Sequence, residues 1–166
     1  CPQAFRAAIA PEQAARAEDR LVDEQLLRQG IVPHLAGELI VVEGAGGLFS
    51  PLGPATLNAD LARDLGLPVV VVDAARLGLI GRTLATVTAA RSVGLTVAAV
   101  VISETAATAT TEPPDRPDSP ATIAAASLAD LRRRLPELPI GWLGHQADLI
   151  EPTIDWSSLA TLVRQP

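Results

Sequence analysis

The sequence predicts an α/β fold with a mostly parallel sheet flanked by helices, and three observations support this. The 166 residues are 48% hydrophobic and 19% charged, which is typical of a single globular domain. Four short apolar runs, at residues 39–42, 68–72, 96–102 and 138–143, alternate with segments of helical periodicity. The two middle runs are β-branched and nearly continuous, which favours parallel strands covered on both faces.

Helices are expected before and between these runs. The patterns at residues 11–17 and 20–29 are helical, and Gly30 is expected to end the second of them. The next two helices are expected at residues 58–65 and around Ile80, Leu84, Val87 and Ala90, which fall at helical spacing. The last is expected at residues 121–135, where an arginine-rich end suits the helix dipole. Residues 104–120 are rich in Pro, Thr, Ala and Asp and predict a flexible loop.

Composition excludes several classes of protein. The net charge is −6 with no basic stripe, so nucleic-acid binding is not expected. A single Cys excludes an internal disulfide framework and a Cys-rich metal site, and a reducing cytoplasm is the expected setting. No apolar run approaches the roughly 20 residues of a membrane span. The chain starts at Cys1 and has no Met, which predicts a fragment or a processed product.

Three polar residues each follow a predicted strand. Glu43, Asp73 and Ser103 are therefore expected on one rim of the sheet, where ligands of such folds bind. Glu43 opens the stretch V-V-E-G-A-G-G-L-F at residues 41–49. A carboxylate there could bind Mg²⁺, while the small residues after it let backbone N–H groups approach phosphate. The alternative is a solvated turn with an ordinary ion pair. Asp73 similarly either contacts a second metal or substrate amine, or caps a turn.

The sequence contains neither a P-loop motif nor a dinucleotide-binding fingerprint. There is no Lys, so no G-x-x-x-x-G-K-[ST] loop occurs, and Phe49 interrupts a dinucleotide fingerprint. The stretch V-V-E-G-A-G-G-L-F-S-P-L at residues 41–52 instead resembles the second signature of the dethiobiotin synthetases. Further segments resemble this family in the same order, namely residues 1–18, 59–61, 66–70, 76–84, 94–95 and 140–144.

The resemblance implies a P-loop NTPase-like α/β domain of a cytoplasmic, homodimeric ligase of biotin biosynthesis. Such an enzyme uses ATP and Mg²⁺ to carboxylate 7,8-diaminononanoate with CO₂ and to close the ureido ring of dethiobiotin. Residues 1–166 would be a single domain, the C-terminal two thirds of the synthetase domain. The family's P-loop, its catalytic lysines and a second metal carboxylate are expected upstream of Cys1. The fragment alone is therefore expected to be inactive, because these groups supply most of phosphoryl-transfer catalysis.

The resemblance also assigns site residues in this chain. Glu43 would bind Mg²⁺. The nucleotide phosphates would be lined by the small residues that follow it: Gly44, Ala45 and Gly46. The tail carboxylate of the substrate would be held by backbone N–H groups at a helix start: Gly78, Leu79 and Gly81. The adenine base would lie against two residues after a strand and a late loop: Ser103, Glu104, Gly144, His145, Gln146 and Glu151.

Three positions depart from the family pattern. Gly81 and Ser103 stand where the family has Asn, and Gly144 stands where Pro is usual. The side-chain amide of Asn binds adenine with a donor nitrogen and a separate acceptor oxygen, whereas the Ser103 hydroxyl has a single oxygen. The base preference of this chain is therefore left open. Two alternatives to the synthetase are considered. One is a related P-loop amidation enzyme or ATPase, and the other is a degenerate, non-catalytic nucleotide-binding or dimerisation module.

Overall fold

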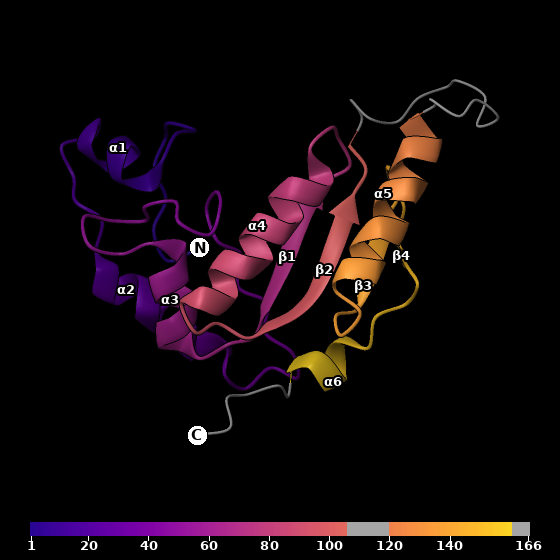
Figure 1. Ribbon diagram of the computed structural model, residues 1–166. Helices are drawn as coiled ribbons and strands as arrows, with labels where there is room; N and C mark the ends of the chain where they lie inside the picture. The colour runs from indigo at the N-terminus through magenta and orange to yellow at the C-terminus, as the bar shows by residue number, and fades with distance from the viewer. Residues whose placement is uncertain (106–119, 161–166) are drawn as a thin grey trace.

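The computed structural model describes residues 1–105 and 120–160. Within these residues, a four-stranded sheet has the order β1-β2-β3-β4. Its strands are β1 (Val69–Ala74), β2 (Val97–Ser103), β3 (Ile140–Leu143) and β4 (Ile150–Glu151). The first three strands are parallel and β4 is antiparallel to β3. The expected mostly parallel sheet is confirmed (Figure 1).

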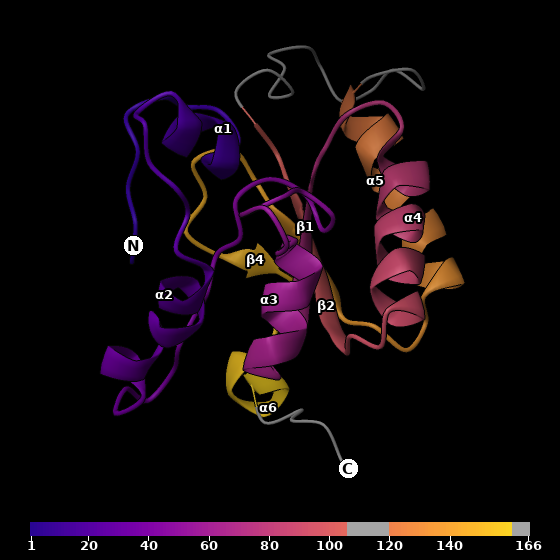
Figure 2. The ribbon, with the colours of Figure 1, turned by 90° about the vertical axis from the view of Figure 1, so that its left-hand side faces the viewer.

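Helices flank this sheet, as predicted. They are α1 (Pro11–Arg16), α2 (Glu24–Gln29), α3 (Asn58–Leu65), α4 (Leu79–Ser92), α5 (Pro120–Arg134) and α6 (Trp156–Ala160), with a short 3-10 helix at Val32–His34. Helices α4 and α5 lie together on one face of the sheet, and α6 lies on the other (Figures 1 and 2). Helices α1 to α3 lie beside the β1 edge (Figure 2). Most of the flexible loop predicted at residues 104–120 falls on residues 106–119, outside the described residues.

The central strand β2 is buried on both faces, which explains its continuous apolar sequence. Val100 and Ile102 are completely buried and share one core with Leu131 of α5. Ala99 and Val101 point to the opposite face, into a smaller core beneath β4 and α6. Because side chains alternate along a strand, a strand between two layers of structure needs apolar residues at every position.

The prediction that both middle strands are covered on both faces is wrong for β1. Its inner-face Val71 is buried, but Val70 and Val72 are 37% and 65% exposed. The sequence does not distinguish the two strands, since both are runs of β-branched residues. The difference arises because β1 is the end strand of the described sheet and one of its faces is left largely uncovered.

The strand predicted at residues 39–42 is also wrong for this structure. These residues have no regular secondary structure, and Leu39, Val41 and Val42 are 52%, 83% and 43% exposed. An isolated strand is not stable, because its N–H and C=O groups need a neighbouring strand to bond to. No strand among the described residues pairs with this segment or with the outer edge of β1.

The helix predictions are confirmed with small shifts. Helix α3 occupies the predicted residues 58–65. Helix α2 begins at Glu24 rather than residue 20, because the carboxylate of Asp23 accepts a bond from the Leu26 N–H and caps the helix. Gly30 ends it, as expected.

Candidate functional site

Residues 43–47 form an exposed turn, and residues 48–57 connect it to α3. The structure gives the Glu43 carboxylate no hydrogen bond or ion pair with any described residue, so the ordinary ion pair considered above is not formed. Gly46 has φ +85, and a Cβ there would lie 2.7 Å from the Ser50 Oγ. Both the backbone conformation and the space therefore require glycine at this position.

The turn is bonded to the start of α3. The Asn58 side chain donates from Nδ2 to the carbonyl oxygens of Ala45 and Gly47, at 2.9 and 2.8 Å. The Gly47 N–H donates to the Ser50 Oγ at 2.9 Å. By contrast, the N–H groups of Gly44, Ala45 and Gly46 have no acceptor among the described residues. Consecutive unbonded N–H groups in a turn are suited to an anion.

A second group of predicted residues is brought together at the carboxyl ends of β2 and β3. Ser103 pairs with Leu143, and the Glu104 N–H donates to the Leu143 carbonyl at 2.8 Å. The Glu104 Oε2 in turn accepts from the His145 N–H at 3.1 Å. The residues assigned to the base therefore lie along neighbouring strand ends, although Glu104 and His145 are 41 positions apart in the sequence.

The remaining members of that group lie in and after the same loop. Gly144 follows β3 directly, and a Cβ on it would lie 3.9 Å from the Glu104 Oε2. Gln146 has φ +56, in the left-handed region. Glu151 is in β4 and pairs with Trp142 of β3.

The third predicted group lies at the start of α4. Gly78 is the N-cap, with φ +85. The N–H groups of Gly78 and Gly81 have no acceptor among the described residues. The Leu79 N–H, however, donates to the Arg76 carbonyl at 3.0 Å, and the Leu79 side chain is buried. In this conformation Leu79 therefore offers no unbonded N–H group to a ligand.

Asp73 accepts hydrogen bonds that stabilise the turn before α4. Its carboxylate accepts from the Arg82 Nε at 3.1 Å, from the buried Thr83 hydroxyl at 3.1 Å and from the Ala74 N–H at 2.8 Å. Arg82 also donates to the Leu77 carbonyl at 2.7 Å. These bonds engage the carboxylate within the protein, so its observed role is to hold the turn.

The expected common rim is confirmed for two of its three residues. Asp73 and Ser103 lie at the ends of adjacent parallel strands, where Ala74 pairs with Ser103. Glu43 follows no strand, because residues 39–42 do not pair with the sheet. Its place on the rim therefore stays a prediction.

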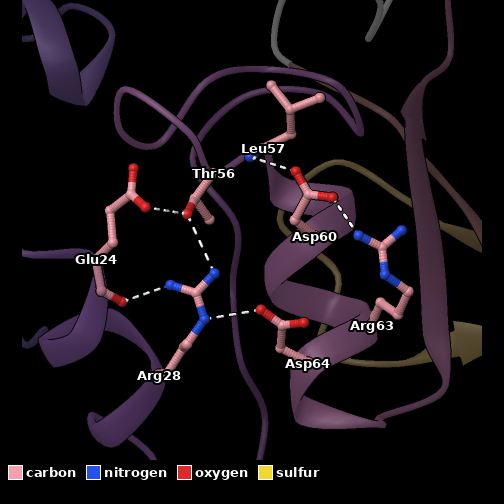
Figure 3. A network of polar contacts seen from close by, with 7 residues as sticks. All are labelled: Glu24, Arg28, Thr56, Leu57, Asp60, Arg63 and Asp64. Atoms are coloured by element: carbon pink, nitrogen blue, oxygen red, sulfur yellow. Dashed lines mark hydrogen bonds and ion pairs between the residues drawn. The ribbon is translucent and has the colours of Figure 1, made fainter.

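A polar network between α2 and α3 was not predicted from the sequence (Figure 3). Glu24 of α2 accepts from the Ala55 N–H at 2.8 Å and from the Thr56 hydroxyl at 2.7 Å. Arg28 donates to Thr56 at 3.2 Å and to Asp64 of α3 at 2.7 Å. The spacing of Glu24 and Arg28 indicates only a surface pair on a helix, and nothing in it points to partners some thirty residues away.

Hydrogen bonding lowers the pKa values of two carboxylic acids beside the loop between α2 and α3, Glu24 and Asp60. The Ala55 N–H, followed by the Thr56 hydroxyl, holds the pKa of Glu24 below its ordinary value. The Leu57 N–H, followed by the Arg63 side chain, lowers the pKa of Asp60. Both carboxylates are thus ionised at neutral pH, and they tie α2 and α3 to the loop between them.

The site residues fit Mg²⁺ only in the company of phosphate. Among residues 1–105 and 120–160, no group of three or more His, Cys, Asp or Glu residues could hold a metal by itself. Glu43 offers one unbonded carboxylate beside the turn. Mg²⁺ commonly takes one or two carboxylates and completes its coordination with phosphates and water. The donor set of this chain therefore suits a metal–nucleotide complex rather than a free ion.

No helix in the described part of the chain has the length and apolar character needed to span a membrane.

Comparisons with known proteins agree with the fold. A family model described as an AAA domain matches residues 1–150. The chain is 45% identical over 109 residues to a protein named ATP-dependent dethiobiotin synthetase BioD from Anaeromyxobacter dehalogenans strain 2CP-C, an alignment that covers 63% of this chain and 48% of the relative. It is 44% identical over 104 residues to the protein of the same name from Gloeobacter violaceus, covering 62% and 45%.

A more distant relative of the same name, from Rhodopirellula baltica, is 35% identical over 114 residues, covering 62% of this chain and 44% of the relative. The chain thus spans about half the length of the curated relatives it matches. The family match covers most of the chain, and the resemblance seen in residues 41–52 agrees with it. The chain belongs to the AAA domain family and is similar, over this part, to ATP-dependent dethiobiotin synthetases.

Proposed function

We propose that the complete protein is an ATP-dependent dethiobiotin synthetase, which carboxylates 7,8-diaminononanoate with CO₂ and closes the ureido ring. The observation that carries the proposal is the turn at residues 43–47. It combines an unpaired carboxylate with unbonded N–H groups, in a chain similar to proteins named for this ATP-dependent reaction. The related amidation enzyme or ATPase considered above has no observation in its favour here.

Each group of residues then has a role in binding. The N–H groups of Gly44, Ala45 and Gly46 would bind the nucleotide phosphates, and Glu43 would hold the Mg²⁺ that accompanies them. When bound, the metal neutralises phosphate charge and orients the nucleotide. Gly78 and Gly81 would take the substrate carboxylate at the start of α4, where the dipole favours an anion. Leu79 would join them only if its bond to Arg76 opened.

The base would lie against the strand ends at Ser103 and Glu104, with the loop at residues 144–146 beside it. Support comes from the bond between Glu104 and the His145 N–H, which ties this loop to β2. Glu151, which lies in β4 after this loop, would complete the group.

We further propose that a segment outside this sequence supplies the P-loop and the catalytic lysines. The sequence contains no Lys, and the chain spans about half the length of its relatives. The structure offers a place for an additional strand, because the outer edge of β1 and residues 39–42 are both unpaired among the described residues. We expect residues 1–166 alone to be inactive, and the complete protein to be a cytoplasmic homodimer.

The first test uses the protein expressed from its full reading frame, with dethiobiotin formation as the assay. We expect synthetase activity from this protein and none from residues 1–166 alone. Glu43→Gln in the full protein should reduce turnover by about 100-fold or more and raise the Mg²⁺ concentration needed for half-maximal rate. Glu38→Gln, an exposed acid in the same segment, serves as the matched control and should leave both unchanged. Unchanged turnover in the Glu43 variant would refute the metal assignment.

One alternative has a structural observation in its favour. Gly81 lacks a side chain to contact the substrate, and the Leu79 N–H is already bonded. A non-catalytic nucleotide-binding or dimerisation module is consistent with these departures. Titration of the full protein with Mg·ATP and then with the diamine separates the two: binding of nucleotide without turnover would favour the module.

A further inference from the structure

Asn58 links the glycine turn to the first turn of α3. Its Nδ2 donates to the carbonyl oxygens of both Ala45 and Gly47. Carbonyl oxygens only accept hydrogen bonds, so the NH₂ end of the amide must face them and the Oδ1 must point the other way. The orientation of this side chain is therefore set by its chemical partners.

The other end of the amide lies against Gly44. The Oδ1 is buried and has no hydrogen-bond donor among the described residues. A Cβ built on Gly44 would lie 2.6 Å from this oxygen. Gly44 therefore has no room for a side chain on this side. Asn58 thus anchors the turn through two carbonyl oxygens and packs against Gly44.

Asn58 is not needed to cap its own helix. The Leu57 N–H at the start of α3 donates to the Asp60 Oδ2 at 2.9 Å, and the Asn58 N–H donates to the Ser50 carbonyl at 3.1 Å. Asn also has a poor helix propensity relative to Ala, and its Oδ1 is left without a donor at some energetic cost. Its side chain therefore serves the turn rather than the helix.

Because the peptide bond is planar, the contacts of Asn58 with the turn also set the direction of a neighbouring N–H group. The C=O of one residue and the N–H of the next lie in the same plane and point in opposite directions. Holding the Ala45 carbonyl toward Asn58 consequently directs the Gly46 N–H away from α3. Gly46 is exposed and its N–H has no acceptor among the described residues.

We propose that Asn58 is a positioning residue of the nucleotide site: by anchoring the carbonyls of Ala45 and Gly47 it aims the Gly46 N–H at a nucleotide phosphate. This inference rests on the proposed function, because it concerns the same glycine turn. Asn58 itself does not touch the nucleotide. Its effect is to hold the turn ready for the anion, so that binding does not have to reorganise it.

The test measures nucleotide binding to the full-length protein by calorimetry, with Mg·ATP and adenosine as separate probes. Asn58→Ala removes both anchoring bonds, and Asn58→Asp keeps the shape but removes the donors. We expect Mg·ATP to bind about tenfold more weakly to Asn58→Ala, since one aimed hydrogen bond to a charged group is lost. The loss should be larger for Asn58→Asp, whose charge opposes phosphate. Adenosine binding should not change, because adenosine has no phosphate.

Asp60→Ala is the matched control, because it removes a contact at the same helix start without touching the turn. It should lower the thermal midpoint of unfolding while leaving the affinity for Mg·ATP unchanged. Equal weakening of Mg·ATP binding in the Asn58 and Asp60 variants, or weakening in neither, would overturn the proposal.

A second set of experiments tests the same contacts in the absence of nucleotide. In Asn58→Ala, amide hydrogen exchange at Gly47, whose N–H is bonded to the Ser50 Oγ in the wild type, should accelerate relative to wild type and Asp60→Ala. Gly44→Ala should destabilise the wild type more than it destabilises Asn58→Ala, because its new Cβ meets the Oδ1. Additive effects and unchanged exchange would show that Asn58 does not hold the turn. If the wild type bound no Mg·ATP while these experiments gave the expected results, the proposed function would fail and the positioning of the turn would stand.

Discussion

Replacing Thr56 by Val tests the polar network between α2 and α3 most sharply. Thr56 is 1% exposed, and its hydroxyl donates to Glu24 at 2.7 Å and accepts from Arg28 at 3.2 Å. Valine has almost the same shape, so the substitution removes the hydroxyl without leaving a cavity. Any loss of stability therefore reports on the two hydrogen bonds.

The magnitude follows from what remains after the substitution. A hydrogen bond to a charged group contributes about 1.5–3 kcal/mol, and a neutral one about 1 kcal/mol. Glu24 keeps its bond to the Ala55 N–H and Arg28 keeps its bond to Asp64, and both side chains are partly open to water. Water recovers part of the loss, so we expect Thr56→Val to reduce the free energy of unfolding by about 1–2 kcal/mol.

Urea denaturation followed by circular dichroism measures this loss. For a slope of about 2 kcal/mol per molar urea, the midpoint should fall by about 0.5–1 M. Thr56→Ser keeps the hydroxyl and serves as the control; it should lose less than the valine variant. A valine variant as stable as the wild type would refute the reasoning, because it would show that the network adds no net stability.

The same variant has a characteristic pH dependence. The folded pKa of Glu24 lies below its unfolded value, so its ionised form stabilises the protein above the unfolded pKa, and this contribution is lost as pH falls through the folded pKa. Wild-type stability should consequently decline below about pH 4. Because the Thr56 hydroxyl is one cause of the lowered pKa, the decline should be smaller in Thr56→Val. An identical decline in both proteins would contradict the assigned cause.

Two further predictions concern the helices on the sheet. Gly81 lies within α4 with open space around its Cα, so Gly81→Ala should raise the thermal midpoint by a few degrees, as expected for about 1 kcal/mol of helix propensity; a lowered midpoint would show that the position needs glycine. Leu131 is completely buried between α5 and the sheet, so Leu131→Ala should cost about 2–5 kcal/mol in denaturant unfolding. Arg133→Ala, at an exposed position of the same helix, should change stability by about 0.5 kcal/mol or less. Equal effects of these two substitutions would contradict the assigned core.

The local patterns that were predicted correctly are those in which neighbouring residues decide the outcome. Helix α3 was found at the expected residues because its apolar spacing, its acidic first turn and the left-handed Gly66 at its end act within one segment. Strand β2 was found because burial on both faces requires apolar residues at every position. A turn was expected at residues 43–47 because glycine adopts backbone conformations that other residues rarely adopt, and Gly46 has φ +85.

The failures concern features that depend on a distant partner. Residues 39–42 have the composition of a strand, but pairing requires a neighbour that the described chain does not provide. The exposure of Val72 depends in the same way on β1 being an end strand. The bond between Leu79 and Arg76 could not be read from sequence, because it depends on the conformation of the turn before α4.

The sequence by itself determined the fold class, the order of three of the strands with the helices between them, and the resemblance to dethiobiotin synthetases, since all of these depend on residue types and their spacing. Only the tertiary structure decided which carboxylates are already occupied and which are available. Asp73 is bonded within the protein, while Glu43 is bonded to no described residue. Only the tertiary structure, too, brought Asn58 against the glycine turn and Thr56 between Glu24 and Arg28. Hydrogen bonds act over about 3 Å in space, whatever the separation along the chain, so their partners are known only once the chain is folded.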